Sequence, residues 1–201
     1  MNNYKIVLLS GDGIGPEISD VSKKILNKLS KKFNFNCEIK EELFGGIAYE
    51  KKGLPAPQET LDECKSSDAV LLACVGDTKY DSVSRNLRPE TGLLKLRSEL
   101  NLFANIRPVK IRKSLLNASS LKKEFIENVD LIVVRELTGG IYFGEPRGIV
   151  NISGERKGFN TMAYSASEIK RITDVAIKIT KKRNNKICSV DKANVLEVSQ
   201  L

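Results

Sequence analysis

The sequence has 201 residues, 41% of them apolar and 29% charged, with a formal net charge of +8, four cysteines and no histidine. That length can bury one good hydrophobic core or two small ones, and the composition is ordinary for a globular protein. Without histidine or a C-x-x-C pair, the usual zinc sites are excluded, and acid–base chemistry near neutral pH falls to Lys, Tyr, Asp or Glu.

Charge and hydropathy also bear on location and partners. No run approaches the roughly 18 apolar residues of a membrane span, and the first residues lack the basic and apolar regions of a secretory signal. The positive charge would suit a polyanion such as nucleic acid, but the basic clusters lie at expected helix ends or in loops without interleaved aromatic residues. We therefore predict a cytoplasmic protein that binds small anions rather than nucleic acids or membranes.

The first hundred residues alternate between strand and helix patterns. We expect a strand, an amphipathic helix, a strand, a helix and a buried strand, in that order, at residues 4–10, 17–32, 36–44, 56–66 and 68–75. This order is typical of a parallel sheet covered by helices. A helix at residues 92–101 follows, and we expect a domain boundary near residue 100.

The second hundred residues mix strands, loops and helices. Extended segments are expected at 102–109, where Pro108 ends the strand, and at 130–134 and 186–190, with a short helix at 122–128.

Three further features complete the second half. Residues 141–143 and 149–152 can pair as a hairpin or a projecting arm, and Ser165 and Glu168 predict a capping box before a helix that runs through residue 182. The helical pattern at 194–201 stops after about two turns without a helix-ending signal, which is typical of a severed chain.

A reactive grouping follows the apolar strand at 130–134. Arg135 stands at the carboxyl end of that strand, where open α/β folds bind their ligands, and a glycine pair and an isolated tyrosine, Tyr142, come next. A cation, a phenol and flexible backbone suit an anionic substrate and a proton transfer. The alternative is an arginine that caps a strand and a tyrosine that packs in a hairpin.

Two more arginines also stand near element ends. Leu93, Leu94 and Arg97 are three and four residues apart, so they share one helical face, and Arg107 ends a strand pattern. Arginine binds carboxylates through paired hydrogen bonds, so Arg97, Arg107 and Arg135 together would suit a dicarboxylate. Separately, each arginine could equally form a surface ion pair.

Two other segments carry weaker signals. The turn at residues 11–16 follows a strand and opens a helix, as a dinucleotide-binding loop does, but its glycine spacing departs from G-x-G-x-x-G, so a plain tight turn is the alternative. Lys192 projects at the end of the expected strand 186–190, where nearby guanidinium groups would disfavour its ammonium form and let it act as a base. A solvated lysine is the alternative.

Taken together, these segments resemble the isocitrate/isopropylmalate dehydrogenase family of decarboxylating dehydrogenases, and within it the 3-isopropylmalate dehydrogenases. The matching segments are Gly11-Asp-Gly-Ile-Gly-Pro-Glu17, Arg88-Pro-Glu-Thr-Gly-Leu-Leu94, Leu96-Arg97, Phe103-Ala-Asn-Ile-Arg-Pro108, residues 134–148 and Ser189-Val-Asp-Lys-Ala-Asn-Val-Leu-Glu197. The resemblance implies a two-domain α/β fold that is not of the Rossmann type and is incomplete here, because the family's C-terminal portion lies beyond residue 201.

The resemblance also implies a domain organisation. Residues 1–100 correspond to the N-terminal part of the first α/β domain, and residues 101–201 to a second, dimerisation domain with an arm around 137–160. A homodimer with an active site shared between subunits follows from it.

Substrate-binding roles follow residue by residue. Arg97, Arg107 and Arg135 match the family's malate-binding arginines, and Leu93 and Leu94 match the pocket for the isopropyl group. Isocitrate-specific relatives have a polar contact instead of that apolar pair.

Catalytic and cofactor roles follow in the same way. Tyr142 matches the proton donor to the enolate, and Lys192 matches the base that serves the partner subunit's site. The residues that match nicotinamide cofactor contacts are Ile14, Asp77, Glu90, Asn194 and Val195. At Gly76-Asp77 this sequence departs from the glycine pair of many members.

The implied reaction is the NAD-dependent oxidative decarboxylation of (2R,3S)-3-isopropylmalate to 4-methyl-2-oxopentanoate in leucine biosynthesis, with Mg²⁺ or Mn²⁺ as the metal. The family's metal-binding aspartates lie beyond residue 201, as do the determinants of NAD or NADP preference, so this chain is expected to be inactive by itself. The alternatives are an isocitrate, homoisocitrate or tartrate dehydrogenase and a non-catalytic dimerisation fragment, with a nucleic-acid binder as a distant third.

Overall fold

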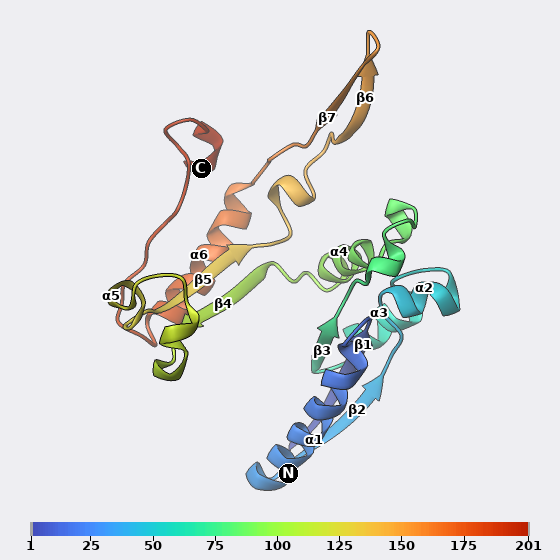
Figure 1. Ribbon diagram of the computed structural model, residues 1–201, viewed down its shortest axis with the longest axis vertical. Helices are drawn as coiled ribbons and strands as arrows, with labels where there is room; N and C mark the ends of the chain where they lie inside the picture. The colour runs from blue at the N-terminus through green and yellow to red at the C-terminus, as the bar shows by residue number, and fades with distance from the viewer. Residues whose placement is uncertain (1, 201) are drawn as a thin grey trace. The chain divides into compact units, whose positions relative to one another are not determined.

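The computed structural model describes residues 2–200, which divide into two compact units, Met1–Asn101 and Leu102–Leu201 (Figure 1). No helix within the described residues is long and apolar enough to cross a membrane. The cytoplasmic location stays a prediction.

The first unit contains a three-stranded parallel sheet in the order β2-β1-β3. Its strands are β1 (Asn2–Gly11), β2 (Phe35–Glu41) and β3 (Ala69–Cys74). Its helices are α1 (Gly15–Phe33), α2 (Gly46–Lys52), α3 (Gln58–Lys65) and α4 (Pro89–Glu99), with short 3₁₀ turns η1 (Thr78–Tyr80) and η2 (Arg85–Leu87). The predicted alternation of strands and helices and the parallel pairing are confirmed, while α2 was not foreseen.

The core of this unit forms around the centre of β1. Val7, Leu8 and Leu9 are fully buried in succession, as expected of a central parallel strand that is covered on both faces. Phe44 and Leu61 add to the same core. This buried strand fixes the position of the glycine-rich turn that follows it.

The second unit is built on an antiparallel ribbon of β4 (Ala104–Lys110) and β5 (Asp130–Glu136), against which α6 (Ala166–Thr180) packs. A hairpin of β6 (Gly148–Ile152) and β7 (Glu155–Phe159) projects from this unit in Figure 1. Its short helical segments are η3 (Lys113–Ala118), α5 (Lys123–Ile126), η4 (Gly140–Tyr142) and η5 (Glu197–Gln200).

The predicted capping box of α6 is confirmed. The Ser165 hydroxyl accepts from the Glu168 amide, and the Glu168 carboxylate accepts from the Ser165 amide at 2.8 Å. The four-residue capping-box pattern therefore predicted the start of this helix correctly. The helix ends at Thr180 rather than at residue 182.

Three sequence predictions were wrong in this unit. Residues 141 and 142 belong to the 3₁₀ turn η4 and residue 143 caps it, while β6 pairs instead with β7. Pro108 lies inside β4, which a two-stranded ribbon tolerates because a proline needs no ladder partner at an open strand edge. Residues 186–190 are irregular and line an open hollow of about 750 Å³ beside β5 and α6, since an apolar run becomes a strand only where a partner strand pairs with it.

Candidate active site

The turn between β1 and α1 needs glycine at its first position. Gly11 has a φ of +67°, and a Cβ there would lie 1.8 Å from the carbonyl oxygen of Cys74. Any side chain would push β1 and β3 apart at their carboxyl ends. The unusual glycine spacing of this segment therefore reflects close strand contact in this fold.

A buried carboxylate organises the same turn. Asp12 is only 4% exposed, and its two oxygens accept three backbone hydrogen bonds of 2.9 Å, from the amides of Gly46, Ile47 and Gly76. Gly46 and Ile47 open α2, whose own N-cap residue, Gly45, provides no side-chain cap. Asp12 therefore caps α2 from a distance and ties the loop after β3 to the glycine-rich turn.

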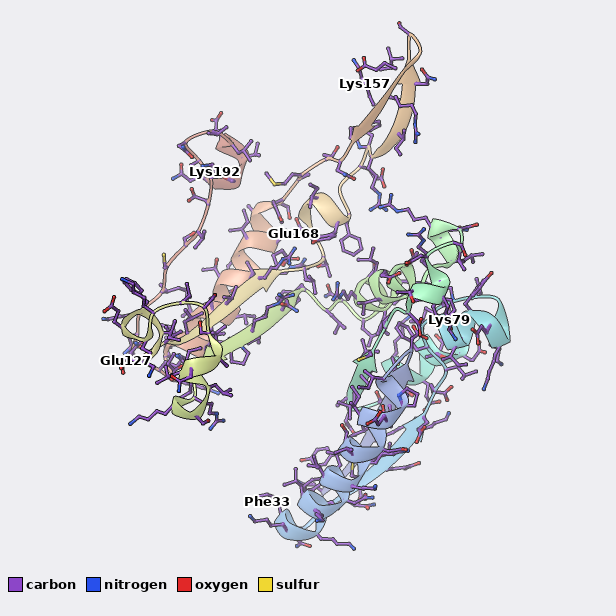
Figure 2. The ribbon with its side chains drawn as sticks, in the orientation of Figure 1. Phe33, Lys79, Glu127, Lys157, Glu168 and Lys192 are labelled. Carbon is purple, nitrogen blue, oxygen red and sulfur yellow. The ribbon has the colours of Figure 1, made fainter. Side chains whose placement is uncertain are left out.

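Three predicted cofactor residues come together around this loop. Ile14 follows Gly13, whose Cβ position lies 4.0 Å from an Asp77 carboxylate oxygen. The carboxylate of Glu90 approaches the Cβ position of Gly76 to 2.8 Å. Asp77 also accepts from the Lys79 amide at 3.1 Å, which starts the turn η1 labelled by Lys79 in Figure 2.

The predicted substrate residues of the first unit lie on α4. Leu93, Leu94 and Arg97 are half-buried, one turn after Glu90, while Leu96 packs into the core. Their spacing places a carboxylate, an apolar pair and a guanidinium in sequence along one side of the helix. That order suits a ligand with polar ends and an apolar branch.

The structure brings two of the three predicted arginines together in the second unit. Arg135 pairs across the ribbon with Asn105, and Arg107 pairs with Val133. Directly opposed residues of an antiparallel pair share a face, so Arg107 and Arg135 are diagonal neighbours on one face of β4–β5. The Arg107 Nε donates to the Asn105 amide oxygen at 2.6 Å, so Asn105 lies between the two cations.

Tyr142 lies beside this pair of arginines. The guanidinium carbon of Arg135 is 5.1 Å from the centroid of the Tyr142 ring, a cation–π contact. Gly140, two residues earlier, has a φ of +68°, and a Cβ there would lie 2.1 Å from the Tyr164 hydroxyl. The turn that holds Tyr142 therefore closes tightly on the segment before α6.

Sequence reasoning missed a hydrogen-bonded group at the end of β5, next to Arg135 in the chain. Arg171 on α6 donates to both carboxylate oxygens of Glu136, at 2.9 and 3.3 Å, and to the Thr138 hydroxyl at 2.7 Å. Burial alone would raise the pKa of Glu136, but hydrogen bonds from Arg171 and Thr138 outweigh it and hold the pKa below its ordinary value. The only sign of this contact in the sequence was a charged residue, Glu136, on the face of an apolar strand that α6 covers.

The remaining predicted residues lie on an exposed segment near the end of the second unit. Lys192, labelled in Figure 2, is exposed and donates its amide to the Ser199 hydroxyl at 2.9 Å. Asn194 and Val195 follow it and are also exposed. These three residues are presented outward from the unit that contains them.

The described residues offer no metal centre. No group of three or more His, Cys, Asp and Glu side chains within residues 2–200 is arranged to hold an ion.

A sequence model of the isocitrate/isopropylmalate dehydrogenase family matches residues 5–201, nearly the whole chain. The chain belongs to this family. The resemblance inferred from its motifs and the α/β fold class are thus confirmed, and the departure from Rossmann glycine spacing is a property of an isocitrate/isopropylmalate dehydrogenase fold.

Individual members of the isocitrate/isopropylmalate dehydrogenase family support this assignment. The chain is 75% identical over all 201 residues to the 3-isopropylmalate dehydrogenase of Prochlorococcus marinus strain MIT 9312, and 58% identical over 199 residues to that of Thermosynechococcus vestitus. It covers 56% and 55% of those relatives. The chain therefore spans a little over half the length of the curated relatives it matches.

Solved structures of the same family agree. The isocitrate dehydrogenase of Methylococcus capsulatus matches with a TM-score of 0.73 and 27% identity, over 98% of this chain and 54% of that one. The β-decarboxylating dehydrogenase of Thermococcus kodakarensis, in its apo form, matches with a TM-score of 0.69 and 26% identity, over 98% and 51%.

Proposed function

We propose that this chain supplies part of the active site of a 3-isopropylmalate dehydrogenase, which oxidises and decarboxylates (2R,3S)-3-isopropylmalate to 4-methyl-2-oxopentanoate in leucine biosynthesis. The observation that carries the proposal is the pair Arg107 and Arg135 on one face of β4–β5, with the Tyr142 ring in contact with Arg135. The 75% identity to a relative of that name supports the choice of substrate.

The arginines account for binding of the dicarboxylate. Arg107 and Arg135 are adjacent cations, so each can grip a carboxylate through paired hydrogen bonds. Arg97 contributes a third guanidinium from α4, and Leu93 and Leu94 provide an apolar surface for the isopropyl branch. An added carboxylate, as in isocitrate, would lose its hydration against that apolar pair.

Proton transfer falls to residues other than histidine. Tyr142 is 45% exposed beside Arg135, so its phenol can reach a substrate held by the arginines and protonate the enolate. Lys192 is the base, and its outward exposure suits a role in the site of a second subunit.

The loop around Gly76 fits the nicotinamide and ribose end of NAD⁺. The carboxylates of Asp77 and Glu90 flank this loop and suit hydroxyl and amide donors rather than phosphates, while Ile14 offers an apolar contact. Asn194 and Val195 add contacts from the partner subunit. These residues would hold NAD⁺, which would supply the hydride acceptor for oxidation at C2 of the substrate. The ligands of Mg²⁺ or Mn²⁺ would come from outside the described residues.

The exposed hairpin supports the proposal of a homodimer. Ile149, Ile152 and Phe159 leave large apolar surfaces on β6–β7 uncovered, and an isolated two-stranded hairpin is marginally stable in water. Pairing of two arms would bury these side chains. Light scattering of a sample at defined concentration should give the mass of two chains.

A chimera tests the activity. Residues 1–201 would be joined to the part of the Prochlorococcus marinus relative that follows its matched segment. With Mg²⁺ and NAD⁺, we expect NADH to form from 3-isopropylmalate and much less from isocitrate, homoisocitrate or tartrate. Equal or greater kcat/KM with isocitrate would overturn the substrate assignment, and NADP⁺ in parallel would give the cofactor preference.

The second candidate function is a non-catalytic dimerisation fragment. It is favoured by the exposed apolar side chains of the β6–β7 hairpin, which a second copy of the chain would cover. We expect the chain by itself to produce no NADH under the same conditions. NADH formation by the isolated chain would rule out this candidate.

A further inference from the structure

Glu136, Thr138 and Arg171 form a closed hydrogen-bonded network at the end of β5. The Glu136 side chain is 8% exposed and that of Arg171 is 30% exposed. One oxygen of Glu136 accepts from the Thr138 amide and the Thr138 hydroxyl, both at 2.9 Å, in addition to Arg171. The guanidinium also packs over the Phe103 ring at 4.7 Å. Every polar atom of the Glu136 carboxylate is thereby engaged.

This network sits directly behind the substrate arginine. Successive side chains of a strand point to opposite faces, so Glu136 faces α6 while Arg135 faces the Arg107 side. Because neighbouring residues share a peptide unit, fixing Glu136 also fixes the backbone from which Arg135 projects.

The network continues into the turn that holds Tyr142. The Leu137 amide donates to the Phe103 carbonyl at 2.8 Å, and the Gly140 amide donates to the Ala163 carbonyl at 3.0 Å. Figure 2 labels Glu168, which lies at the start of α6 on the Arg171 side, 3.8 Å from its Nη2. The turn is therefore held between β4 and the start of α6.

We propose that Glu136 and Arg171 are positioning residues that hold Arg135 and Tyr142 in the geometry needed for substrate. The inference rests on the proposed function of Arg135 and Tyr142. Stability alone does not explain a charged pair here, because apolar residues of similar volume often replace a buried ion pair without loss. A guanidinium fork bound to a carboxylate does fix the angle between α6 and the strand end.

Amide hydrogen exchange tests the positioning role on the chain itself. In Arg171→Met, the amides of Thr138, Gly140 and Gly144 should exchange about tenfold faster or more, because their closed state depends on the network. Lys170→Met is the matched control, since it removes an exposed ion pair with Asp174 from the same helix. Unchanged exchange in Arg171→Met, or an equal increase in the control, would overturn the proposal.

Steady-state kinetics of the chimera test the functional consequence. Arg171→Met should raise the KM for 3-isopropylmalate and lower kcat/KM about 10- to 100-fold, because small misplacements of binding groups are costly, and should leave the KM for NAD⁺ unchanged. Arg171→Lys should recover only part of the loss. A fall in kcat equal to the fraction of unfolded protein, with both KM values unchanged, would show a merely structural role and overturn the proposal.

The two failures are distinguishable. An inactive unsubstituted chimera would contradict the proposed function, while hydrogen exchange in the isolated chain would still decide whether Arg171 holds the turn. An active chimera with an Arg171→Met variant of unchanged kinetics would contradict the positioning role alone.

Discussion

Each unit ends a strand at a buried carboxylate, but the two carboxylates are satisfied in different ways. Asp12 accepts only from backbone amides, whereas Glu136 accepts chiefly from the Arg171 and Thr138 side chains. The donors to Asp12 are backbone amides, which most substitutions leave in place, whereas the Arg171 side chain can be replaced. In the first unit, loss of Asp12 alone removes all three hydrogen bonds, while the bonds to Glu136 in the second unit can be lost one at a time.

The largest expected effect is at Asp12. Asp12→Ala leaves three amides near α2 and Gly76 without acceptors, and at about 1–3 kcal/mol for each buried unsatisfied group we expect a loss of about 3 kcal/mol or more. Urea unfolding followed by circular dichroism measures it. Asp68→Ala is the control, because Asp68 accepts an exposed backbone hydrogen bond from Lys5. Equal losses in both variants would contradict the capping role.

A smaller loss is expected at the turn before Tyr142. Gly140→Ala combines a positive φ with a contact to Tyr164, so it should cost about 2–3 kcal/mol. Gly154→Ala shares the positive φ, at +84°, but has open space around its Cβ position. The difference between their unfolding midpoints isolates the contact with Tyr164, and identical midpoints would show that the turn does not close on it.

A loss of about 1 kcal/mol is expected for Ser165→Ala, which removes the side-chain cap of α6. Ser167→Ala, two residues later, keeps the bond between Ser165 and Glu168 and serves as the control. Helix content by circular dichroism during thermal unfolding measures both. A control as destabilised as Ser165→Ala would argue against the cap.

The same contrast explains what could be predicted from the sequence. The capping box at Ser165 depends on residues close in sequence, and the strand around Val7 depends on an apolar run. Both were predicted. The Asp12 bonds join residues 34, 35 and 64 positions apart, and the Glu136–Arg171 bond joins residues 35 apart, so no local pattern contains them.

The predicted site residues divide along the same line. Arg107 and Arg135 share a face because of strand register, which alternation could suggest once the strands were paired. Residues 186–190 had the apolar pattern of a strand, but pairing depends on a partner strand that the pattern does not specify. Periodicity therefore gave the elements, whereas the groups that anchor the site came only from the three-dimensional structure.

The smallest effect concerns acid stability in the second unit. The pKa of Glu136 is lowered from its ordinary value of 4.5, so its contribution to stability is fully present above about pH 4.5 and is lost as the pH falls through the folded-state pKa. In Glu136→Gln we expect lower stability at pH 7 and a weaker loss of stability between pH 7 and acid, because the variant has no carboxylate to protonate there. Urea midpoints of both proteins across this range measure the difference. Parallel curves would mean that protonation of Glu136 does not cause the loss of stability in acid, and would contradict the stabilising role of its charge beside Arg171.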